Sequence, residues 1–207
     1  MMKTAWKSLC AASVLCALSV LTPHAARAAQ GDVIVRLRGI VVAPDTSSSG
    51  TLSSINSSVS TTAVPELDFT YMFTDSLGAE LILGTSRHTL NSSLGELGKV
   101  SVLPPTLTLQ YHFNDAGRVR PYIGAGINYT RFYHNSLAVA GEDVDIRNDS
   151  FGPALQAGVD IAVSDMWFVN LDVKKIWMRT DASLGGADLG TLRINPWIVG
   201  FGVGRRF

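Results

Sequence analysis

The feature that most constrains the fold of this chain is an alternation of side-chain type with a period of two. In 33–42, VIVRLRGIVV places Val35 and Leu37 on one face and Arg36 and Arg38 on the other. The same alternation recurs around 66–73, 78–84, 103–113, 121–132, 154–163, 167–175 and 193–207. Successive side chains of a β-strand point to opposite faces, whereas a helix repeats every 3.6 residues, so the pattern predicts strands.

These segments predict eight strands of about nine to eleven residues. That length is typical of tilted strands crossing a bilayer, whereas soluble sandwiches use strands of about five or six residues. Short links are expected near 75–76, 114–118 and 164–165, and long loops at about 44–62, 86–101, 134–149 and 181–191. Short turns on one side and long loops on the other are typical of outer-membrane proteins. The predicted fold class is all-β, an eight-stranded antiparallel transmembrane β-barrel.

The beginning of the chain predicts export. Two lysines precede an apolar stretch from about 9 to 21, and Ala-Arg-Ala at 26–28 provides a cleavage site. We therefore predict a cleaved signal peptide over 1–28 and the barrel over 29–207. A membrane anchor is the weaker alternative, since the stretch is shorter than the roughly 20 residues a spanning helix needs.

Composition narrows the classes further. Charged residues make up 16% of the chain, against about a quarter in soluble proteins, while apolar residues make up 46%. The formal net charge of zero gives no support for a nucleic-acid partner. A soluble periplasmic β-protein and an outer-membrane barrel both remain open, and the strand lengths favour the barrel.

Ionisable residues decide which face meets lipid. Each arginine or lysine facing lipid would cost about 2–4 kcal/mol at the bilayer midplane. Together with the acids, the sum would exceed a domain's net stability of about 5–15 kcal/mol. We therefore predict that the apolar face meets lipid and that the lumen holds Arg36, Arg38, Glu66, Asp68, Glu80, Asp160 and Asp172.

A few inward positions are unusual. The predicted candidates for a dewetted lumen constriction are Met72, Ile82, Phe168 and Ile198, with Lys174 as a further wall residue that pairs with Glu80 or Asp172. Packing of a filled barrel is the alternative. Inward glycines of the fifth and eighth segments either open a narrow passage or admit bulky neighbours. Lys175 falls on the lipid face unless a β-bulge re-phases the strand, and we favour a place at the outer rim.

The connections and strand ends allow three more expectations. The Ser/Thr-rich composition of 44–62 favours a flexible loop, and folding over the mouth is the alternative. Phe207 is expected to face outward on the closing strand. Aromatic residues near strand ends suit interfacial girdles: Tyr71, Phe73, Tyr111, Phe113, Tyr129, Phe132, Tyr133, Trp167, Trp177, Trp197 and Phe207.

Catalytic residue types are sparse. Ser86 lies two residues before His88, a spacing that is weak evidence for a dyad. His134 with acidic residues at 142, 143 and 145 could bind a metal adventitiously, although a solvated acidic loop is favoured. No nucleotide-binding motif is recognisable. We expect no enzyme, no cofactor and no metal site.

Several stretches together resemble the OmpW family of bacterial outer-membrane proteins: PELDFTYMFTDSLGAELIL, LPPTLTLQYHF, RPYIGAGINYT, GVDIAV, VNLDVKKIWMRTD and PWIVGFGVGRRF. The resemblance implies a monomeric barrel in the outer membrane of a Gram-negative cell, passive uptake of small hydrophobic molecules and lateral exit into the bilayer. The chain departs from the family's usual ending at Arg205, where family members typically have a tyrosine.

The expected partners follow from the lumen, the barrel surface and the chain end. They are small hydrophobic solutes, outer-membrane lipid and lipopolysaccharide, and the barrel-assembly machinery, which would read the strand ending in Phe207. The alternative function is a structural or receptor-type barrel for adhesion, phage or bacteriocin binding, without an open pore.

Overall fold

The computed structural model describes residues 28–113, 117–139 and 141–207. The predicted signal peptide, apart from Ala28, lies outside the described residues, as does 114–116 of one predicted short link. In the described part, one antiparallel sheet closes on itself as an eight-stranded barrel. The strands of this ring, in chain order, are β1 (Val33–Ala43), β4 (Thr62–Met72), β5 (Leu77–Gly84), β8 (Thr106–His112), β9 (Val119–Val139), β11 (Asp149–Ala162), β12 (Trp167–Ile176) and β15 (Trp197–Arg206).

Closure joins the first and last strands, as the sequence predicted. β1 pairs with β4 on one side and with β15 on the other. Phe207 extends this seam, because its backbone exchanges hydrogen bonds of 2.9 and 3.1 Å with Val33. Its side chain is 63% exposed. The first and last strands therefore leave no free edge at this seam, which removes a site for aggregation.

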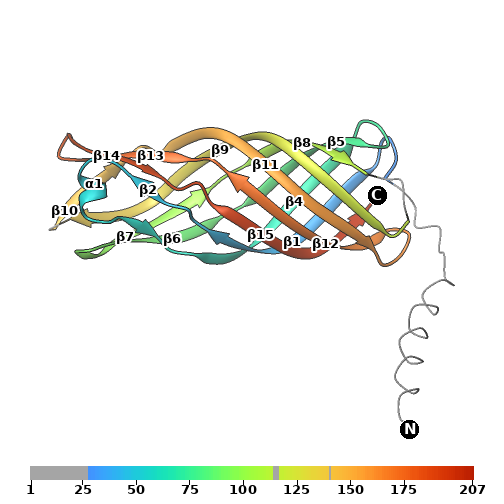
Figure 1. Cartoon of the computed structure of the whole chain (residues 1–207), viewed down its shortest axis with the longest axis horizontal. Coiled ribbons are helices and arrows are strands. Elements are labelled where there is room, and N and C mark those ends of the chain that lie inside the picture. The colour runs from blue at the N-terminus through green and yellow to red at the C-terminus, as the bar shows by residue number, and fades with distance from the viewer. Residues whose placement is uncertain (1–27, 114–116, 140) are drawn as a thin grey trace, which may run out of the picture.

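The barrel is longer than its membrane-crossing segments, and Figure 1 shows the additional strands gathered at the end opposite the C-terminus. They are β2 (Ser47–Ser48), β3 (Ser58–Val59), β6 (Ser86–Ser92), β7 (Gly95–Leu103), β10 (Glu142–Ile146), β13 (Arg179–Leu184) and β14 (Ala187–Arg193). The connections predicted as long loops at 86–101, 134–149 and 181–191 hold most of these strands. They are largely hairpins that continue the wall, because the alternation of inward and outward side chains carries on through them.

The first predicted loop is ordered as well. It contains the short helix α1 (Thr51–Ser54), whose Leu52 is 5% exposed, and its β2 and β3 pair with β14 and β6. The expectation of a flexible tip was wrong, and the alternative, folding over the mouth, is what the structure has. Leu52, Ile55 and Val59 anchor this serine-rich segment on the apolar interior.

The outer surface of the ring is apolar. Leu37, Ile127 and Phe201 are 56%, 61% and 59% exposed, while Arg36 and Arg38 on the same strand as Leu37 are 0% and 1% exposed. This inverts the arrangement of a soluble barrel, where apolar residues face inward. The prediction that the apolar face meets lipid agrees with this distribution. No helix in the described ranges is long and apolar enough to span a membrane.

Exposed aromatic side chains lie at two levels of the barrel. Near the termini they include Tyr71, Phe73, Tyr111, Phe113 and Trp167, and near the other end of the apolar band they include Tyr129, Phe151 and Trp197. Phe132 was wrongly assigned to a girdle: it is 1% exposed, because its even position on β9 points inward. Arg205 lies over the rings of Trp167 and Phe207, with its guanidinium carbon 5.5 and 4.6 Å from their centroids.

Lys175 needs no β-bulge. The pairing of β12 with β11 and β15 runs through Lys174 and Lys175 without a register shift, and Ile176 and Met178 remain buried. The Lys175 ammonium lies 3.1 Å from an Asp45 carboxylate oxygen and 4.9 Å from the centre of the Trp197 ring. Lys175 thus lies at the outer end of the apolar band, which agrees with the rim placement.

Inward glycines admit bulky neighbours. On the fifth predicted segment, a Cβ atom on Gly124 would lie 3.2 Å from the Gln156 side chain and 3.3 Å from the Gln110 side chain. On the eighth, a Cβ atom on Gly204 would lie 2.2 Å from the Phe168 ring. At these two positions the side chains that the glycines accommodate fill the space, so the glycines do not open a passage there.

Candidate functional site

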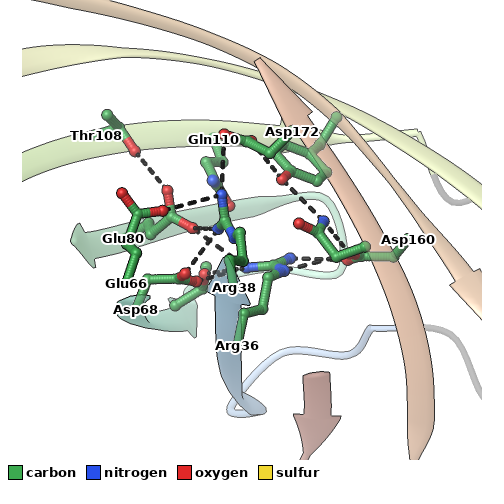
Figure 2. A network of polar contacts seen from close by, with 12 residues as sticks. Arg36, Arg38, Glu66, Asp68, Glu80, Thr108, Gln110, Asp160 and Asp172 are labelled. Carbon is green, nitrogen blue, oxygen red and sulfur yellow. Dashed lines mark hydrogen bonds and ion pairs between the residues drawn. The ribbon is translucent and has the colours of Figure 1, made fainter. Parts of the chain in front are cut away.

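The membrane-spanning half of the interior holds a network of buried charges built around Arg38. Its guanidinium nitrogens lie 2.8 Å from Asp68, 2.9 Å from Glu80, 2.9 Å from Asp172 and 3.6 Å from Glu66. Figure 2 shows the two arginines between Glu66, Asp68 and Glu80 on one side and Asp160 and Asp172 on the other. The alternation on β1, β4, β5, β11 and β12 points all of them inward.

Arg36 and Lys174 complete this network. Arg36 donates to both carboxylate oxygens of Asp160, at 3.2 and 2.7 Å, and to Thr70 at 2.8 Å. Lys174 donates to Glu66 and lies 3.1 Å from Asp172. Lys174 therefore contacts Asp172, one of its two expected partners, and Glu66 in place of Glu80.

The charged side chains of the network fill the barrel interior at their own level. The side chains of Arg36, Arg38, Asp68 and Glu80 are 0% exposed. Charges lining an aqueous pore would remain accessible from the lumen. Because these groups are enclosed by one another, the straight route through this level of the barrel is filled.

The predicted constriction residues do not share one level of the barrel. Met72 and Phe168 form a small cluster with Ala28 and Ile34 at the end near the termini. Ile82 and Ile198 line the interior on the other side of the charge network, and Lys174 lies within the network. The five residues therefore do not form a single ring.

An apolar cavity lies directly beyond the charges, and we call it the middle cavity. It has a volume of about 50 Å³. Glu66 and Lys174 border it on one side, and most of its lining is apolar: Ile40, Val42, Val59, Val64, Ile82, Leu90, Val100, Val102, Ile176, Met178, Ile194 and Ile198.

A second cavity, the outer cavity, lies within the hairpins beyond the membrane band. It has a volume of about 140 Å³, and α1, β7, β10, β13 and β14 contribute to its lining. Leu90, Val100 and Ile194 line both cavities, so the two are neighbours across these three side chains. Among the described residues, seventeen buried apolar side chains of this region form one continuous cluster.

The middle cavity also contains a polar pair. Ser86 Oγ lies 2.9 Å from His88 Nε2, and His88 Nδ1 lies 2.8 Å from the Ser60 carbonyl oxygen. His88 lies on β6, outside the membrane-crossing strands, and is 4% exposed. Burial lowers the pKa of His88 below its ordinary value of 6.5, and the hydrogen bond to the Ser60 carbonyl only partly opposes this.

The sequence named His134 as a possible adventitious metal ligand. His134 adopts a positive φ of 46° on β9. Among the described residues, no group of three or more His, Cys, Asp or Glu side chains is placed to hold a metal ion. His112 lies in the spanning part of the interior, where its ring stacks on Tyr122 at a centroid distance of 5.3 Å.

The cavity walls were missed at the sequence level because they come from segments expected to be loops. Leu90 and Val100 lie on β6 and β7, and Ile194 follows β14. The signal that could have found them is the same period-two alternation, which continues from His88 to Leu90.

The closed sheet, the apolar belt and the enclosed charges together define an outer-membrane β-barrel protein. Comparison with known families agrees, because the OmpW family model matches residues 29–207. The chain belongs to the OmpW family, and its location is the cell outer membrane.

Individual relatives cover most of the chain. An uncharacterized outer-membrane protein of Sinorhizobium fredii, y4mB, is 44% identical over 181 residues, which is 84% of this chain and 79% of the relative. Outer membrane protein W of Escherichia coli is 38% identical over 188 residues, covering 86% and 89%. The crystal structure of OprG from Pseudomonas aeruginosa superposes with a TM-score of 0.77 at 29% identity, covering 87% of this chain and 98% of OprG.

Proposed function

We propose that the chain is a non-enzymatic channel that takes up small hydrophobic molecules through the apolar outer half of the barrel and releases them sideways into the membrane. The observation that carries this proposal is the division of the interior into apolar cavities on the outer side and enclosed charges on the inner side. A greasy solute gains about 25 cal/mol per Å² of apolar surface that it removes from water. The paired charges offer it no comparable environment.

A gap in the strand pairing supports the sideways exit. β5 pairs with β8 as far as Ile82 and Thr106, and β6 pairs with β7 from Ser86 and Val102 onward. Between these pairs stand Pro104 and Pro105, which lack the N–H that a ladder needs. Gly84, Thr85 and Pro104 at this gap line the middle cavity.

A bulky side chain at the gap tests the route. Gly84 points inward, and a Cβ atom there would make only ordinary contacts, the nearest being 3.6 Å from the Pro65 carbonyl oxygen. Gly84→Phe should therefore fold and place its ring in the middle cavity. We expect it to reduce uptake of a hydrophobic dye by vesicles carrying the protein.

The matched control is Gly39→Phe, because a Cβ atom on Gly39 meets nothing within 4 Å. This variant adds the same ring on the lipid face, so uptake should remain at the level of the unmodified protein. Equal uptake by the two variants would contradict an exit at the gap. A chain that passes neither ions nor dye would favour the structural or receptor-type barrel.

Ile82→Asp tests the apolar wall itself. Ile82 is 4% exposed and lines the middle cavity. A carboxylate there would hold water in the path of an apolar solute, so dye uptake should fall. Unchanged uptake would show that Ile82 takes no part in passage.

Anionic outer-membrane lipid is a further proposed partner. Arg179 and Arg193 lie directly opposite each other on β13 and β14, and both line a groove with Phe151 and Trp177. Like charges opposite each other destabilise a sheet, and a phosphate between them would remove that repulsion. Replacing both arginines with serine should weaken co-purification of lipopolysaccharide, while unchanged co-purification would contradict this contact.

A further inference from the structure

Ser86 and His88 form the polar feature of the middle cavity that the uptake route does not use. The other polar side chains of the lining are engaged within the protein. Glu66 accepts from Lys174, and the Thr106 hydroxyl donates to the Pro104 carbonyl while accepting from the Asn128 amide. The Thr85 hydroxyl contacts the Val102 carbonyl and the Tyr133 hydroxyl.

The hydrogen-bond partners fix the tautomer of His88. The Ser60 carbonyl oxygen can only accept, so Nδ1, 2.8 Å away, must carry the proton. In the neutral ring, Nε2 is then the acceptor, and the Ser86 hydroxyl, 2.9 Å away, must donate to it. The hydrogen of Ser86 is therefore used, whereas its oxygen keeps lone pairs that can accept.

We propose that the Ser86 oxygen is an acceptor site for a ligand hydroxyl group, so that the middle cavity selects small hydrophobic molecules with one hydrogen-bond donor. Short-chain alcohols are the chemical class that fits a cavity of about 50 Å³. Ketones and ethers of the same size offer only acceptors, and they would meet an oxygen whose hydrogen is already given to His88. This inference rests on the proposed function, because it takes the middle cavity to be where the hydrophobic solute binds.

Propan-2-ol, acetone and isobutane have the same number of heavy atoms, so they test the selectivity at one size. Binding to the full detergent-solubilised protein is followed by nuclear magnetic resonance, and the ¹⁵N spectrum of His88 reports its tautomer. We expect propan-2-ol to bind about three- to tenfold more tightly than acetone, the range of one net hydrogen bond. The spectrum should show a protonated Nδ1 and a bare Nε2 at neutral pH.

Two variants separate the roles of the pair. Ser86→Ala leaves Nε2 free to accept from the alcohol directly, so the preference for propan-2-ol should persist. Ser86→Ala combined with His88→Leu removes both acceptors, so propan-2-ol and acetone should then bind equally. Isobutane should bind the double variant as it binds the unmodified protein, which also shows that the cavity has kept its shape.

The outcomes distinguish this inference from the proposed function. Equal binding of all three compounds to the unmodified protein would leave the apolar cavity standing and overturn the donor preference alone. A protonated Nε2, or a preference that survives in the double variant, would also overturn the inference. If none of the three compounds binds, the proposed function fails and the inference fails with it.

Discussion

Replacing Arg38 with methionine should strongly destabilise the barrel. The guanidinium contacts Asp68, Glu80 and Asp172 at 2.8–2.9 Å, and all of these side chains are 0% exposed. Methionine fills a similar volume but leaves these carboxylates without their main counter-charge. Removing one partner of a buried ion pair costs about 3–5 kcal/mol, which corresponds to about two to four decades in the folding equilibrium constant.

The assay is urea unfolding of the protein refolded in lipid vesicles, followed by the fluorescence of Trp167, Trp177 and Trp197. Arg147→Met is the control, because Arg147 pairs with Asp181 at 3.3 Å where the two side chains are 61% and 51% exposed. An exposed pair contributes about 0–1 kcal/mol.

A charge-balanced variant tests the reason for the loss. Arg38→Met combined with Glu80→Gln should recover part of the lost stability, because one uncompensated carboxylate is gone. If Arg38→Met lowered the unfolding free energy no more than Arg147→Met does, water would have to be solvating the carboxylates, and the enclosed network would be refuted.

Three further predictions concern the outer hairpins, the inward glycines and the chain end. Burial lowers the pKa of His88 in the folded state, so below about pH 6.5 the unfolded chain binds more protons and the free energy of unfolding should decrease as the pH is lowered. His88→Gln should make the free energy of unfolding depend less on pH in this range, and an unchanged pH dependence would contradict the prediction. Gly204→Val would force a Cβ atom against the Phe168 ring at 2.2 Å and should cost about 1–3 kcal/mol in urea unfolding, whereas Gly39→Val should be close to neutral. Phe207→Ser should leave refolding in vitro unchanged and lower the amount assembled in cells, because Phe207 is exposed on the closing strand; equal amounts in cells would argue against recognition of this residue.

The ring of eight strands could be predicted because two independent signals agree. The period of two gives the strands, and the desolvation cost of Arg36, Arg38 and Lys174 determines which face turns inward. The side-chain period is a local property of each strand, so it can be recognised without knowing which strands lie next to it. The same reasoning places Leu37 and Phe201 on the lipid face, where the structure has them.

The partners within the interior could not be predicted in this way. The alternation along the strand predicts that Lys174 points inward. Its contact with Glu66, however, depends on the register of strands far apart in the chain. The outer cavity was harder to predict, because its lining residues Leu90, Val100 and Ile194 meet only after three hairpins have paired. Composition argued against those hairpins, because serine, glycine and charged residues in 86–101 resemble a loop.

The most direct test measures uptake of a hydrophobic dye and ion conductance in vesicles that carry the unmodified protein. Both quantities are compared with those of the Ile194→Asp variant. Ile194 lines both cavities, so a carboxylate there lies on the proposed route. We expect fast dye uptake with little ion conductance for the unmodified protein and slow uptake for the variant. High ion conductance with dye uptake no faster than in empty vesicles would contradict the account.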